Sequence, residues 1–199
     1  MIASSQAGRA ASATLRAHAM TVAARAVVDS IRRGQRDFLA DARSVLDRPM
    51  LADATDPVVS AFVVAYDEAV ETLGECTPRH PRCAARALSA AHAAEYAASL
   101  ADQQARRSAR RGIYPHLHAP LDVRGLDLVR EARASLELAT HAWPASAATR
   151  HCHRAARLTE ELGVGVPDLL TAAWQALLDE PATVAAALSL PVSAAGTQV

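Results

Sequence analysis

Apolar residues recur every three or four positions along most of this chain, and glycine and proline fall between the stretches that show this period. A repeat of about 3.6 residues is typical of a helix with one buried face, whereas a half-buried strand alternates every two residues. No stretch shows a convincing alternation. The pattern therefore predicts an all-α fold, an irregular bundle of six to eight helices. The predicted helices cover residues 4–33, 35–48, 57–73, 78–111, 122–142, 145–162, 167–178 and 181–188.

The bundle is predicted to form around residues 78–111, a long helix rich in alanine, the best helix former. Thr77 can cap its start, Pro78 suits the first helical position, and Gly112 can adopt the left-handed conformation past its end. One stripe of this helix holds only small side chains, so a neighbouring helix can approach closely. The stripe consists of Cys83, Ala87, Ala90, Ala94, Ala97, Ala98, Ala101 and Ala105.

Two other predicted helices, residues 4–33 and 122–142, also have apolar faces. The helix of residues 122–142 has an inner face that is predicted to continue to Trp143, and the helix of residues 4–33 is predicted to end at Gly34. The predicted organisation is one helical domain over residues 1–190, in which helix 4–33 can be peripheral, and a disordered tail over residues 191–199. The apolar face of helix 4–33 holds Leu15, Ala19, Val22 and Ala26.

The composition narrows the possible functions. Hydrophobic residues make up 51% of the chain but aromatic residues only 4%, which favours a core of Ala, Leu and Val between helices. All 21 basic residues are arginine, so phosphate-binding loops and Schiff-base or pyridoxal-phosphate enzymes that need a lysine are excluded. The motifs Glu-x-x-His, His-Glu-x-x-His and Gly-x-Ser-x-Gly are absent too. These absences favour a protein that is not an enzyme.

Charge is arranged in blocks although the net charge is zero. The net charge is +5 over residues 1–36, −7 over 37–75, +5 over 76–118 and −3 over 119–199. Neighbouring blocks of opposite sign can pack against one another without an external polyanion, so a nucleic-acid partner is not favoured. Three cysteines without a secretory signal indicate a reduced, cytoplasmic setting, although the arginine-bearing N-terminus also resembles an organelle transit peptide. No apolar run is long enough to cross a membrane.

Soft metal ligands cluster at the start of the long helix. Cys76, His80 and Cys83 lie within eight residues of one another, and His80 and Cys83 are one helical turn apart. A tetrahedral zinc site needs a fourth ligand, which His116 or His118 can supply from the following loop. The spacing matches no strong zinc signature, so structural roles for these residues are the alternative. A metal-binding protein or small enzyme built on this group is the first alternative function.

Three arginines, Arg79, Arg82 and Arg86, surround the same helix start. Cations are unfavourable at the positive end of a helix dipole unless an anion offsets them. That anion is either an acidic side chain nearby, such as Glu71 or Glu75, or a bound phosphate or carboxylate that uses the free backbone N–H groups. The arginines therefore mark a candidate anion site that does not require a cofactor.

Residues 158–174 fit a helix-turn-helix motif weakly, with Gly163 in the turn. The second helix of this motif, residues 167–178, has no arginine, and a recognition helix without cations reads DNA poorly. DNA binding is therefore the second alternative. The function that the sequence favours is a non-enzymatic cytoplasmic helical protein that works by binding a protein partner or a second copy of itself. No cofactor is expected, except zinc if the Cys/His cluster is a metal site.

Overall fold

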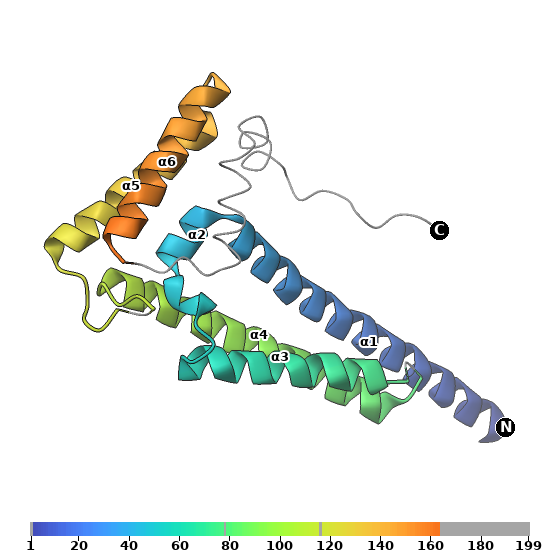
Figure 1. Cartoon of the computed structure of the whole chain (residues 1–199). Coiled ribbons are helices and arrows are strands. Elements are labelled where there is room, and N and C mark those ends of the chain that lie inside the picture. The colour runs from blue at the N-terminus through green and yellow to red at the C-terminus, as the bar shows by residue number, and fades with distance from the viewer. Residues whose placement is uncertain (1, 78, 116, 164–199) are drawn as a thin grey trace. The chain divides into compact units, whose positions relative to one another are not determined.

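The computed structural model describes residues 2–77, 79–115 and 117–163, and the side chains of all of these except residues 2–10, 40 and 42. Every regular element in this part of the chain is helical, so the all-α prediction is confirmed. The predicted helices 167–178 and 181–188 and the predicted tail lie outside the described residues. The elements are α1 (Ile2–Ala40), α2 (Ala42–Asp47), the short 3₁₀ helix η1 (Pro49–Ala52), α3 (Pro57–Glu75), α4 (Pro81–Arg110), α5 (Val123–His141) and α6 (Ala145–Glu161) (Figure 1).

The chain divides into two compact units, each with its own core. The first unit comprises Met1–Gln35 and Ala54–Gln104, and the second comprises Arg36–Asp53 and Ala105–Val199. The single domain over residues 1–190 stays a prediction.

The core of the first unit is built by α1, α3 and α4 from very small side chains. Along α4 the buried positions are three and four residues apart, as in a coiled coil. Because nearly all of them are alanine, the neighbouring backbones can lie close together. The α4 seam, as we call this row, consists of Ala84, Ala87, Ala91 and Ala94, none of which has exposed surface. The predicted stripe is buried only in part: Ala87, Ala94, Ala101 and Ala105 are buried, whereas its other four members are half-buried. The buried Ala84 and Ala91 were not part of that prediction.

The start of α4 differs from the prediction, which placed the cap at Thr77 and the first turn at Pro78. The helix begins at Pro81, and the backbone carbonyl of His80 accepts the first helical hydrogen bond, from the Ala84 N–H at 3.0 Å. Both prolines suit a first helical position. A residue before a proline avoids helical dihedrals, so His80 cannot easily belong to a helix that begins at Pro78.

Gly34 does not end α1, contrary to the prediction. The helix continues to Ala40, and an added Cβ at Gly34 would meet nothing within 4 Å. A glycine inside a helix costs only about 1 kcal/mol relative to alanine, which a helix of this length tolerates. The break comes at Asp41, whose carboxylate caps α2 by accepting from the Arg43 N–H at 3.0 Å and the Ser44 hydroxyl at 2.8 Å.

The second unit centres on the hairpin of α5 and α6, which pack along their length. Its interior again uses small side chains, with Phe38, Val45 and Leu46 adding bulk from the end of α1 and from α2. Two ion pairs link the helices, Arg154 with Glu131 and Arg124 with Glu161. The small buried residues of the hairpin are Ala132, Ala139, Ala148, Cys152 and Ala155.

Trp143 does not continue the inner face of α5, as predicted, but is 91% exposed. The helix ends at His141, and Ala142 adopts an extended conformation before Pro144. The helical period therefore no longer decides where the next side chain points.

The loop between α4 and α5 is closed at its base by a glycine. Gly112 has a positive φ of 73°, and its carbonyl accepts the Leu121 N–H at 2.8 Å. A Cβ at Gly112 would lie 2.8 Å from the Leu121 carbonyl oxygen, closer than atoms of real side chains come. Both the dihedral angle and the close approach therefore require glycine here.

Candidate functional site

Two of the predicted metal ligands, Cys76 and Cys83, lie together in the first unit. Cys76 is buried and Cys83 is half-buried, and both are free thiols. Burial raises the pKa of the Cys76 thiol to about 11, and its hydrogen bond with Cys83 adds to the rise. A metal ion binds the thiolate, so this environment disfavours the form of Cys76 that would act as a ligand.

Of the other predicted ligands, only His80 belongs to the same unit and is described. His80 is exposed and, with Cys83, lines a shallow pocket of about 290 Å³. His118 belongs to the second unit, and His116 lies outside the described residues. Within residues 2–77, 79–115 and 117–163, no three His, Cys, Asp or Glu side chains gather closely enough to hold a metal ion. The metal site stays a prediction.

Arg79, Arg82 and Arg86 are all exposed around the start of α4. Arg79 precedes the helix, whereas Arg82 and Arg86 lie in its first two turns. Ion pairs with Glu71 or Glu75, the predicted internal partners, are absent from this described region. The anion site at these three arginines also stays a prediction.

The face of α1 opposite its buried side carries an apolar row. The buried side consists of Ala17, Thr21, Ala24 and Val28, which are at most 5% exposed. On the outer face Leu15 is 71% exposed and Val22 is 54% exposed. The outer row repeats at three and four residues, the spacing of a second coiled-coil interface. The α1 stripe, as we call it, consists of Leu15, Ala19, Val22 and Ala26, all exposed.

The edges of the α1 stripe are basic. Arg16 lies on one side of it, and His18 and Arg25 lie on the other. Residues 11–28 contain no acidic side chain. The stripe is therefore an exposed apolar strip between two arginines, Arg16 and Arg25.

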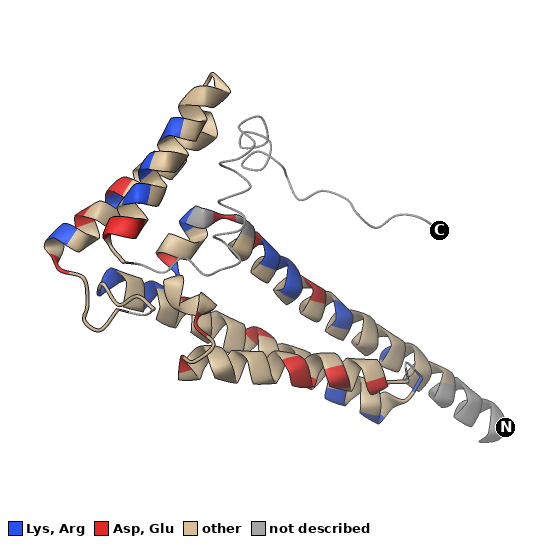
Figure 2. Cartoon of the chain, viewed as in Figure 1, with Lys and Arg blue, Asp and Glu red and all other residues tan. Residues whose placement is uncertain are grey.

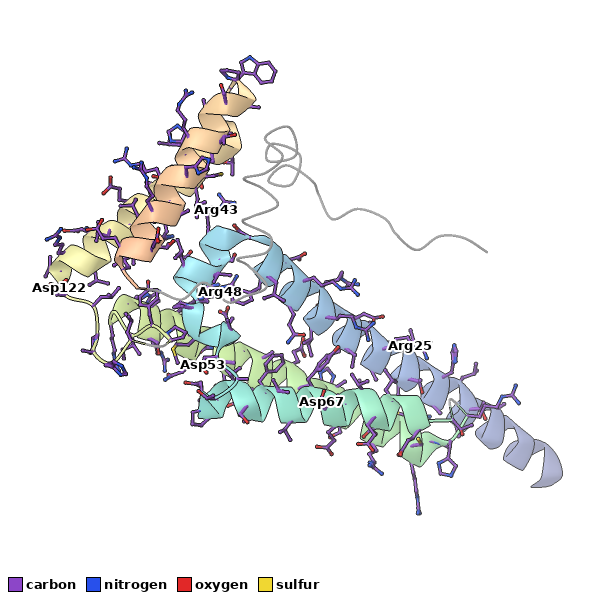
Figure 3. All side chains as sticks on the ribbon, in the orientation of Figure 1. Arg25, Arg43, Arg48, Asp53, Asp67 and Asp122 are labelled. Carbon is purple, nitrogen blue, oxygen red and sulfur yellow. The ribbon has the colours of Figure 1, made fainter. Side chains whose placement is uncertain are left out.

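The outer face of α3 has the opposite character, with Val64 65% exposed among carboxylates. Figure 2 shows arginines along α1 and acidic residues along α3, and Figure 3 labels Arg25 and Asp67 as examples. None of these α3 carboxylates forms an ion pair with a described arginine of α1. The α3 acidic face consists of Asp67, Glu68, Glu71 and Glu75 around Val64, all exposed.

A cavity of about 420 Å³ lies within the second unit, between the last turns of α4, the end of α2 and one side of α5. Its floor is apolar, and four arginines and one aspartate surround the floor. We call it the arginine cavity. It is lined by Leu46, Asp47, Arg106, Ala109, Arg110, Tyr114, Leu126, Val129, Arg130 and Arg133.

Two contacts fix the wall of the arginine cavity. The guanidinium of Arg133 reaches both carboxylate oxygens of Asp47, at 2.7 and 3.1 Å. The buried Tyr114 hydroxyl donates to the Leu46 carbonyl at 3.2 Å. Burial, and then the negative charge of Asp47, raise the pKa of Tyr114 to about 12, so this phenol stays a neutral donor.

Sequence reasoning missed the arginine cavity because its walls come from separate helices. Arg106 and Arg110 are one turn apart on α4, and Arg130 and Arg133 are one turn apart on α5. This local spacing was a usable signal for two basic patches. The approach of α5 to the end of α4 is not encoded in either spacing.

No family model, curated protein or solved structure matches this chain. Over the described residues, no helix has both the length and the apolar character that crossing a membrane requires. The function of the chain is therefore inferred from its own surfaces.

Proposed function

We propose that this protein is a non-enzymatic helical interaction protein that associates with a second copy of itself, the α1 stripe of one copy packing on the α3 acidic face of another. The observation that supports this most strongly is the exposure of Leu15 and Val22 at coiled-coil spacing on a helix whose other side is already buried. Because one apolar side of α1 is already buried, the α1 stripe remains available for a partner.

Charge favours the α3 acidic face as the occupant. Pairing two α1 stripes would bring Arg16 and Arg25 of both copies together, which like-charge repulsion opposes. On α3 the same cations would meet the carboxylates of Glu68 and Glu71, which are exposed. Complementary charge sets the choice of partner and its register more than it sets affinity.

The expected affinity is modest. Fully burying a leucine or valine contributes about 1.5–3 kcal/mol, so Leu15 and Val22 together retain on the order of 2–4 kcal/mol, given exposures of 71% and 54%. Association itself costs at least about 4 kcal/mol, so the alanines and ion pairs must supply the rest. We therefore expect dimers that form at micromolar concentrations or above and weaken as salt screens the ion pairs.

Sedimentation equilibrium over a wide concentration range tests the proposal. The wild-type chain, with a monomer mass of 21.0 kDa, is expected to show a mass that rises with concentration. The double variant Leu15→Glu/Val22→Glu is expected to stay monomeric with unchanged helix content by circular dichroism. Val123→Glu is the matched control, since Val123 is 74% exposed on α5, outside both faces.

A mixing experiment separates this arrangement from the pairing of two α1 stripes. A second variant, Glu68→Arg/Glu71→Arg, has an intact α1 stripe and an altered α3 face. Neither variant should dimerise alone, but their mixture should, because one contact between an intact stripe and an intact acidic face remains. Pairing of two stripes would leave the arginine variant dimeric. A wild-type chain that stays monomeric at several hundred micromolar would refute self-association.

A further inference from the structure

We propose that the arginine cavity of the second unit binds a small organic phosphate, a phosphomonoester with an apolar body. The inference is independent of self-association, because the α1 stripe and the α3 acidic face both belong to the first unit. It rests on the cavity's size, its apolar floor and its excess of arginine.

The size and floor suit the body of such a ligand. A volume of about 420 Å³ lies within the range of small-molecule pockets. Val129 and Leu46 are buried in the floor, and Ala109 and Leu126 are half-buried beside them. An apolar group that covered these side chains would displace water from them, which is favourable.

The charges suit the phosphate. Four arginines line the cavity against a single lining carboxylate, that of Asp47, which Arg133 already engages at two points. Arg106 also has an interaction of its own, so the charge offered to a phosphate comes from Arg110 and Arg130. Arg130 pairs with Asp127 at 2.6 Å, but both side chains are more than half exposed, so this pair contributes little and is easily exchanged. A phosphomonoester carries nearly two negative charges and three acceptor oxygens, and guanidinium groups match these acceptors better than other cations do.

A neighbouring cavity shows that arginine content alone does not define the site. It also measures about 420 Å³ and shares Arg130 and Arg133 with the arginine cavity. Its third arginine, Arg43, faces the carboxylates of Asp41 and Glu137 and forms ion pairs with both. With three arginines and three acids in its lining, it has no excess charge to offer an anion.

The simplest alternative is that these arginines only complement the negative end of the α4 dipole. That role applies equally to Arg107, which lies in the same last turns of α4 but does not line the cavity. On α5, Arg124 is an exposed arginine that does not line the cavity. Arg107 and Arg124 are therefore matched controls for Arg110 and Arg130.

Isothermal titration of the full chain with phenyl phosphate tests the proposal. Saturable one-to-one binding is expected, with weaker binding of inorganic phosphate, which lacks the apolar body, and none of phenol, which lacks the charge. A charge-assisted hydrogen bond is worth about 1.5–3 kcal/mol, so Arg110→Gln and Arg130→Gln should each weaken binding by at least about tenfold. Arg107→Gln and Arg124→Gln should each change it less than about twofold, as for exposed charges outside a site.

Competition with phenyl phosphate then identifies the source of the phosphate. Displacement by adenosine monophosphate points to a soluble nucleotide, and displacement by vesicles containing phosphatidic acid points to a lipid headgroup. The proposal is overturned if phenyl phosphate gives no saturable heat at low millimolar concentration. It is equally overturned if Arg107→Gln weakens binding as much as Arg110→Gln does, since the arginines would then act only as general surface charge.

Discussion

Replacing Ala91 with leucine is expected to destabilise the first unit by about 1–3 kcal/mol, the usual cost of overpacking a core. Ala91 lies in the middle of the α4 seam with no exposed surface. It belongs to a cluster that includes Ala24 and Val28 of α1 and Ala69 of α3. Three added carbon atoms can fit there only if the helices move apart, which also loosens the contacts of neighbouring alanines.

Ala93 provides the matched control, because it lies two residues further along the same helix and is exposed. Ala93→Leu should change the free energy of unfolding by less than about 0.5 kcal/mol, as surface substitutions usually do. Glycine extends the comparison. Ala93→Gly should cost about 1 kcal/mol in helix propensity, and Ala91→Gly should cost a further 0.8 kcal/mol or so for the lost buried methyl group.

Urea unfolding followed by far-UV circular dichroism gives these free energies, with slopes compared to check that each variant unfolds in the same way. Close packing at the α4 seam requires that Ala91 tolerate neither a larger nor a smaller side chain, whereas Ala93 tolerates the larger one. If Ala91→Leu matched Ala93→Leu, or raised the midpoint above that of the wild type, close helix packing at this seam would be wrong.

Two further predictions concern titrating groups. Burial alone would raise the pKa of Asp41, but hydrogen bonds from Ser44 and Arg43 outweigh it and hold the pKa below its ordinary value. This carboxylate therefore stabilises the fold fully above the unfolded pKa of about 3.9, and the contribution is lost as pH falls through the lower folded value. The control is Asp41→Asn, because asparagine can still cap α2 but carries no charge. At neutral pH the wild type should have the larger free energy of unfolding in urea, and this difference should shrink towards about pH 3. A difference that does not change with pH would contradict the assignment. Cys76, with a pKa of about 11, should react slowly with iodoacetamide at neutral pH in the native chain and faster in urea, as peptide mass spectrometry would show, and equal rates would contradict its burial.

Helical periodicity predicted the fold well where helices are long and capped. The helix predicted over residues 57–73 is α3, and the Asp56 carboxylate caps it by accepting from the N–H groups of Val58 and Val59 at 2.8 and 3.2 Å. Errors arose where two residues suited the same role, as with Pro78 and Pro81, or where a weak helix breaker was outweighed by the length of α1. These are competitions between small energies, and a single sequence pattern does not rank them.

The functional surfaces were harder to predict, because they depend on which face finds a partner within the chain. The apolar face of Leu15 and Val22 was identified, but α1 has a second face, of Ala17 and Ala24, and that smaller one is buried. Alanine allows the close approach that α4 requires, so side-chain size alone was a misleading guide to burial. The arginine cavity needs α4 and α5 together, which no local spacing reveals.

The hydrogen bond between Gly112 and Leu121 also determines where residues can be inserted into this chain. The hydrogen bond between the Leu121 N–H and the Gly112 carbonyl holds the two ends of the α4–α5 loop together. Residues inserted at the exposed tip of the loop, at His118 and Ala119, would therefore enlarge the loop without displacing the start of α5. Lengthening a loop that is already closed costs little entropy. That tip is therefore the natural position for an inserted epitope or a fluorescent label, whereas a single side chain at Gly112 would disturb the whole junction.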